Sequence, residues 1–91
     1  MKLNTTGVEN TAVGHHALNV NTSGGNNTAI GRLALVLNTT GSLNTAVGVA
    51  VLDANTSGAS NTGLGSAALT SNTTGAYNTA VGASSGFATT T

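Results

Sequence analysis

The chain of 91 residues lacks cysteine, proline and tryptophan, and only four of its residues carry a formal charge. The absence of cysteine excludes a disulfide framework. The four charges cancel to zero, so the basic surface that nucleic acid requires is missing, and so is a polybasic membrane face. The longest apolar run, residues 33–37, is too short to span a bilayer. We therefore expect no nucleic-acid partner and no membrane insertion of this segment.

Large apolar residues are also scarce, and residues 1–3 contain no apolar stretch that would mark a targeting signal. Leu, Ile, Val and Phe supply 19 of the 91 residues, which is close to the level below which disorder becomes the default. A disordered low-complexity segment is therefore one interpretation. High net charge, the other half of that signature, is absent. Strict periodicity also argues against disorder, because a disordered tract has no reason to hold register.

Asn, Thr and Gly are abundant, supplying 42 of the 91 residues, and they recur with a period of 17. Five rows cover residues 4–88 without insertion or deletion, after a lead-in at residues 1–3. Residues 89–91 open a sixth row. Each row reads Asn-Thr-Thr/Ser-Gly, two variable residues, and then Asn-Thr-Ala-Val-Gly or a close variant. A fixed period with its own chemistry in each column indicates a repeat architecture.

The composition favours β-structure, since Thr, Asn and Gly are poor helix formers. If each row is one coil, equal positions stack about 4.8 Å apart. The sequence thus predicts an all-β parallel β-solenoid, a β-roll or β-helix of five coils with 17 residues each. We expect turns at the Asn-Thr-Thr/Ser-Gly stretch, whose Asn and Gly tolerate positive φ. Strands are expected around Asn-Thr-Ala-Val and around the Ala-Leu segment, residues 16–19 in the first row.

Four columns are predicted to form structural ladders along the axis. Asn side chains can stack as amide ladders, the aliphatic and Leu columns would fill a narrow core, and the Gly column would allow tight corners. With the aliphatic column inside, Val47→Asp should abolish folding. The columns are Asn10, Asn27, Asn44, Asn61 and Asn78; Val13, Ile30, Val47, Leu64 and Val81; Leu18, Leu35, Leu52 and Leu69; and Gly14, Gly31, Gly48, Gly65 and Gly82.

The Ala column next to the aliphatic column carries the prediction of a partner. Neighbouring residues on a strand point to opposite faces, so an inward Val13 would turn Ala12, Ala29, Ala46, Gly63 and Ala80 outward as a smooth apolar strip. Such a strip suits a partner chain, and no capping element is evident at either end of the repeats. We therefore expect a homo-oligomer, most simply a parallel homotrimer with threefold symmetry; the alternative is a monomer.

The Asn-x-Ala-Ile/Val-Gly unit, as in residues 27–31 and its four equivalents, resembles the head repeats of trimeric autotransporter adhesins. It is also similar to repeat segments of phage and viral tail-fibre proteins. The resemblance covers residues 4–88 and implies a left-handed parallel β-roll assembled as a trimer, located outside the cell, on its surface or on a virion. The coil of those adhesin heads is shorter, so the additional Asn-Thr-Thr-Gly stretch here is a departure that affects the cross-section.

No catalytic set is visible, and we expect no enzymatic activity, no cofactor and no metal. His15 and His16 would point to opposite faces of a strand, which makes them poor joint ligands. Glu9 and Asp53 are single acids in variable columns, unsuited to paired acid–base chemistry. The Gly columns form no GxGxxG motif between a strand and a helix, which argues against phosphate binding.

Six stretches match the N-glycosylation sequon: one Asn-Thr-Thr or Asn-Thr-Ser in each row, and Asn26-Asn27-Thr28. Glycans on asparagines stacked about 4.8 Å apart would not fit side by side. We therefore interpret these asparagines as structural ladders.

These patterns predict a structural or adhesive fibre module, in which variable columns contact a host-surface glycan or protein receptor. One alternative is a monomeric, Thr-rich solenoid that binds ice. Ice binding usually requires two outward threonines separated by one residue in each coil, whereas here Thr11 is followed two residues later by Val13. A second alternative is an engineered consensus-repeat scaffold, since the five rows are nearly identical.

Overall fold

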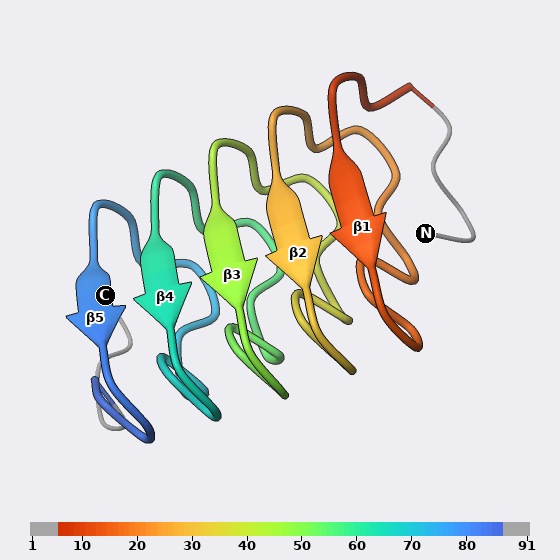
Figure 1. Cartoon of the computed structure of the whole chain (residues 1–91). Coiled ribbons are helices and arrows are strands. Elements are labelled where there is room, and N and C mark those ends of the chain that lie inside the picture. Colours follow the sequence, from red (N-terminus) through yellow and green to blue (C-terminus); the bar gives the residue numbers. More distant parts are fainter. Residues whose placement is uncertain (1–5, 87–91) are drawn as a thin grey trace.

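The computed structural model describes residues 6–86 and has one short strand in each repeat (Figure 1). The strands form one parallel sheet in chain order. This confirms the all-β parallel β-solenoid with a 17-residue repeat; residues 1–3 and 89–91 lie outside the described part of the chain. The strands are β1 (Thr11–Val13), β2 (Thr28–Ile30), β3 (Thr45–Val47), β4 (Thr62–Leu64) and β5 (Thr79–Val81).

The register between neighbouring strands is a shift of one repeat, so that Thr11 pairs with Thr28 and Val13 with Ile30. The coils remain hydrogen-bonded outside the strands. For example, the Leu18 amide donates to the Ala34 carbonyl at 3.1 Å, and the Leu33 amide donates to the His15 carbonyl at 3.0 Å. Much of the irregular backbone of each coil therefore forms its hydrogen bonds with the neighbouring coils, as buried peptide groups require.

The Ala-Leu segment is a turn, so the prediction of a second strand at residues 16–19 is wrong. His16 and Leu18 lie in the left-handed region, with φ of 61° and 50°, and the same two columns are left-handed in the following coils. Two left-handed residues separated by one residue bend the chain sharply and return it to the next coil. An extended segment could not close so narrow a cross-section.

The third left-handed column also differs from expectation. Positive φ does not occur at the Asn or Gly of the described Asn-Thr-Thr/Ser-Gly stretches. It falls just after them, at the residue preceding the second Asn in each coil. The column contains Glu9, Asn26, Leu43, Ser60 and Tyr77. Left-handed backbone is unfavourable for most of these residue types, so the cross-coil hydrogen bonds must hold it in place; the Asn26 amide, for example, donates to the Val8 carbonyl at 3.0 Å.

The interior is filled by small residues and leucines. The buried apolar cluster is made of the Ala column of the strands, the residues just before the Leu column, and the Leu column itself; its members are Ala17, Leu18, Ala29, Ala34, Leu35, Ala46, Val51, Leu52, Ala68, Leu69 and Ala80. Ala12 packs against this cluster from the first coil.

The aliphatic column of the strands points outward, and the prediction that it faces the core is wrong. Val13 is 57% exposed and Val81 67% exposed, whereas Ala29 and Ala46 are fully buried. The inward direction is set by the asparagine that immediately precedes each strand. Asn27 is buried, and because side chains alternate along a strand, Thr28 then points out, Ala29 in and Ile30 out. The expected loss of folding in Val47→Asp no longer follows.

The one strand that lacks Ala in its centre shows how tightly the coils fit. A Cβ atom on Gly63 would lie 2.6 Å from Cγ1 of Val51, which belongs to the preceding coil. In the other coils the position equivalent to Val51 is a smaller residue, Ala17, Ala34, Ala68 or Ser85. The larger Val51 thus occupies the space that Gly63 leaves, as a closely packed interior requires.

We expect this pair to show strong coupling in a double-mutant cycle. Gly63→Ala should cost about 1–3 kcal/mol by overpacking, and Val51→Ala should cost about 1–3 kcal/mol by leaving a cavity. The double variant restores the pattern of the neighbouring coils and should be more stable than either single variant. Urea unfolding of all four proteins measures the cycle; additive losses would show that the two positions do not share one space.

Candidate functional site

Two columns of buried asparagines run through the solenoid and hold the coils together. The first, which we call the strand ladder, precedes the strands. In it the amide of each residue donates to the side-chain oxygen of the previous coil; Asn27 N to Asn10 Oδ1 is 2.9 Å, and Asn44 N to Asn27 Oδ1 is 3.0 Å. Four of the Nδ2 groups donate to glycine carbonyls, as from Asn44 to Gly58 at 2.8 Å, and that of Asn78 donates to Asn72 Oδ1 at 3.2 Å. The column comprises Asn10, Asn27, Asn44, Asn61 and Asn78.

The second column, the turn ladder, begins each Asn-Thr-Thr/Ser-Gly stretch. Asn38 Nδ2 donates to Asn21 Oδ1 at 2.9 Å, and Asn55 Nδ2 donates to Asn38 Oδ1 at the same distance. The two ladders share acceptors: the Gly41 carbonyl accepts from Asn27 Nδ2 at 2.8 Å and from Asn38 Nδ2 at 3.0 Å. These buried amides are thus paired on both sides, as burial of a polar group requires.

The ladders decide which sequons could be modified in the folded chain. The turn-ladder asparagines Asn21, Asn38, Asn55 and Asn72 are fully buried, so their side-chain nitrogens are inaccessible. Asn26 differs because it lies in the exposed left-handed column. All six sequons were interpreted as ladders. Asn4 lies outside the described residues, and for Asn26, a surface residue, the interpretation is wrong.

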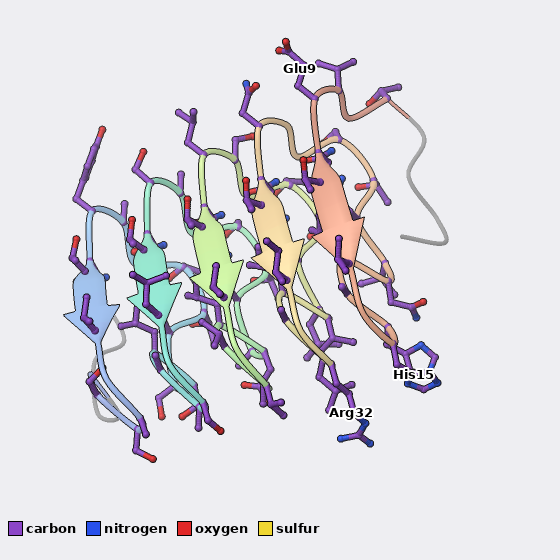
Figure 2. All side chains as sticks on the ribbon, viewed as in Figure 1. Glu9, His15 and Arg32 are labelled. Carbon is purple, nitrogen blue, oxygen red and sulfur yellow. The ribbon has the colours of Figure 1, made fainter. Side chains whose placement is uncertain are left out.

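The outer face of the sheet carries a regular surface, which we call the Thr–aliphatic strip. Each strand contributes one threonine and, two residues later, one branched aliphatic side chain (Figure 2). The threonines are exposed in β1 and β5 and half-buried in the strands between them. Ile30 and Leu64 are 39% and 37% exposed. The strip comprises Thr11, Thr28, Thr45, Thr62 and Thr79 with Val13, Ile30, Val47, Leu64 and Val81.

Charged side chains lie beside the strip, not on it. Figure 2 shows Glu9 beyond the start of β1, and His15 and Arg32 on the turns that follow the strands. The His15 and His16 rings touch edge to face, with centroids 3.9 Å apart. The two residues lie in a turn, so the expectation that they point to opposite faces of a strand is wrong. Among residues 6–86, no three potential metal ligands cluster.

The second Gly column occupies the corner after each strand. Gly14, Gly31 and Gly48 have φ between 127° and 130°, and their Cα atoms approach the carbonyl of the next coil. A Cβ on Gly14, for example, would lie 2.7 Å from the Gly31 carbonyl carbon. The sequence assigned these glycines to corners, and the close approach gives the physical reason.

Asp53 is the acid whose protonation is linked to folding. Partial burial raises the pKa of its carboxyl group above the ordinary 3.8, while the amides of Asp53 and Ala54 oppose the shift. The folded chain therefore holds this proton more tightly than the unfolded chain does. Its contribution favours folding below pH 3.8 and is lost as the pH rises through the raised pKa.

Asp53→Asn is accordingly expected to raise the melting temperature slightly at pH 7 and to leave it unchanged at pH 3. The amide keeps the shape of the side chain without the partly buried charge. Differential scanning calorimetry at the two pH values measures the effect. Glu9→Gln, at an exposed corner, is the control. A lower melting temperature for Asp53→Asn at pH 7 would contradict the assignment.

The described residues form no pocket, and none of their segments is a helix long and apolar enough to cross a membrane. Comparison with known protein families, characterised proteins and solved structures finds no similar protein. The candidate site is therefore a surface, the Thr–aliphatic strip. It was not predicted from the sequence, because the aliphatic column was expected to face the core. The signal that could have revealed it is the two-residue alternation counted from the strand ladder.

Proposed function

We propose that this chain is a structural module of an adhesive fibre, in which a rigid solenoid presents variable side chains to a receptor. One observation carries the proposal: both asparagine ladders repeat without change in the hydrogen-bonded interior, whereas the left-handed column before the strands has a different residue in every described coil and lies at the surface. A scaffold that spaces and displays variable groups needs this division of labour.

The variable groups are chemically suited to contact a glycan or a protein. Tyr77 is 85% exposed and Val8 62% exposed, and they share the corner before the strands with Glu9 and Leu43. An aromatic ring and mixed polar groups are typical of binding surfaces. The resemblance to adhesin heads and tail fibres supports a location outside the cell, on its surface or on a virion.

The argument for a homotrimer changes with the structure. The Ala column, which was expected to bind the partner chains, lies in the core. The proposal therefore does not depend on a trimer, and sedimentation analysis gives the oligomeric state directly.

The test is binding of the folded chain to a glycan array and to host-cell surface proteins. Tyr77→Ala should reduce binding at least tenfold without changing the melting temperature, because the side chain is almost fully exposed. Thr40→Ala, at an exposed turn position, is the matched control and should bind as the wild type does. Absence of binding for the intact chain, or equal losses in both variants, would contradict the proposal.

A further inference from the structure

We propose that the Thr–aliphatic strip is an ice-binding face, whose ligand is the ordered water at the surface of an ice crystal. This inference is independent of the adhesive role, because it depends on the outer columns of the sheet and not on the variable corners. It follows from the outward direction of the aliphatic column: each strand presents a threonine and an aliphatic residue on the same outer face, with the aliphatic residue in the place of the second threonine that ice binding usually requires.

The first argument is the regular spacing of the strip. Threonine stacks on threonine and aliphatic on aliphatic in every pair of strands, from Thr11 and Thr28 to Leu64 and Val81. Neighbouring ranks are about 4.8 Å apart, and the two columns are about 7 Å apart along each strand. The smaller spacing lies close to the repeat of water oxygens in the ice lattice. The strip is thus a grid that is regular in two directions. A crystal lattice can match such a grid, whereas contact with liquid water would not require regular spacing.

The second argument is rigidity. Thr, Val and Ile are branched at Cβ and have restricted χ1 rotamers, and four of the five ranks consist of these residues alone. The ranks are fixed from below by the strand ladder, whose hydrogen bonds tie Asn44 to Asn27 and Asn61 at 3.0 Å each. Water ordered on such a surface loses little further freedom when it joins a crystal.

The third argument is chemistry. Each rank presents a hydroxyl group, which can hydrogen-bond water, and methyl groups, around which water forms an ordered shell. The ten residues of the strip include no charge, and the charged Glu9 and Arg32 extend from the coil corners (Figure 2). A charged side chain would orient water around itself and disturb the lattice-like layer.

The fourth argument is the size of the strip, which favours ice over a second copy of the chain as its ligand. Four strand spacings of about 4.8 Å and two columns about 7 Å apart give an area of about 130 Å². A specific protein interface buries about 800 Å² on each partner, and single exposed apolar patches of a few hundred Å² are ordinary on monomers. The strip is therefore too small to hold a stable homo-oligomer by itself. Ice offers a repeating lattice that needs only local matching.

The experiment is thermal hysteresis and ice-crystal shaping by the purified chain, after sedimentation has established its oligomeric state. The wild type should open a gap between melting and freezing temperatures and produce faceted crystals. Thr45→Tyr, in the central rank, should reduce the gap several-fold. Thr40→Tyr is the matched control, because it makes the same change at an exposed turn position outside the strip, and should preserve the gap.

Circular dichroism shows whether each variant is folded; if Thr45→Tyr does not fold, Thr62→Lys tests the strip with a longer, flexible side chain. Absence of both hysteresis and shaping by the folded wild type overturns the proposal. Equal losses in the strip and control variants do so too. A homo-oligomer that Thr45→Tyr dissociates would identify the strip as a protein interface and overturn it as well. Receptor binding through the variable corners is measured separately, so failure of one proposal does not imply failure of the other.

Discussion

Asn44→Asp is expected to lower the free energy of unfolding by about 3–5 kcal/mol at pH 7, because it places an unpaired charge in the buried strand ladder. Asn44 is fully buried, and its Nδ2 group donates to the Gly58 carbonyl at 2.8 Å. A carboxylate oxygen at that position would face a carbonyl oxygen instead of donating to it. The Asn61 amide, which donates to Asn44 Oδ1 at 3.0 Å, could keep its acceptor.

The loss of stability in Asn44→Asp should depend on pH, and this dependence distinguishes an effect of the charge from an effect of side-chain shape. Burial raises the pKa of the introduced carboxyl group in the folded state above that in the unfolded state. Stability should therefore recover below about pH 4, where the acid is protonated in both states and can donate to Gly58. Asn26→Asp, at an exposed residue, is the matched control and should be nearly neutral. Urea unfolding at pH 3 and pH 7 measures both variants; a loss that is equal at the two pH values would contradict a charge effect.

Gly31→Ala is expected to be at least as damaging, with a loss of about 4 kcal/mol or more. Gly31 has φ of 127°, outside the range that other residues adopt easily. A Cβ atom there would also lie 2.7 Å from the carbonyl carbon of Gly48 in the next coil, and this is backbone that cannot rotate away. The two coils would have to separate, breaking the hydrogen bond from the Gly48 amide to the Ile30 carbonyl at 2.8 Å.

The final corner of the described chain offers a control that isolates the clash from the backbone strain. Gly82 has a similar φ of 120°, but among residues 6–86 a Cβ there would meet only Ser85 Cβ at 4.0 Å. Gly82→Ala should therefore cost only the conformational term, about 1–3 kcal/mol. Thermal unfolding of the two variants measures the difference. Equal losses would show that close stacking between coils contributes nothing beyond φ.

The repeat period, the solenoid and the position of the first strand could be predicted from the sequence because each depends on local or periodic chemistry. Thr, Asn and Gly exclude long helices, and the constant 17-residue spacing fixes the register. These properties do not depend on which side of a strand faces inward. The side of each strand that faces the interior was predicted wrongly, because the large aliphatic residue was assumed to be buried. In a coil this narrow, Ala29 fits against the interior and Ile30 does not.

The remaining errors arise from backbone conformations that residue type does not reveal. Leu18 and Leu35 adopt positive φ although leucine disfavours it. The turn returns their side chains to the core, and their amides donate hydrogen bonds to carbonyl groups of the next coil. Similarly, the presence of Gly63 in an Ala column makes sense only once Val51 is seen beside it. Both features depend on contacts between coils, which cannot be predicted from the conformational propensities of single residues.

The sequence separation of the contacts has a consequence for how the chain folds. Backbone hydrogen bonds between coils join residues only 15 to 18 positions apart, such as Gly24 with Thr39 and Leu43 with Gly25. Closing a loop of that length costs about 2.5 kcal/mol in chain entropy, apart from a constant term, and the cost is the same for each coil. Folding can therefore begin at any neighbouring pair of coils and spread in both directions. The time needed to form the first pair should not increase as coils are added, so a longer version of this solenoid would nucleate no more slowly than a short one.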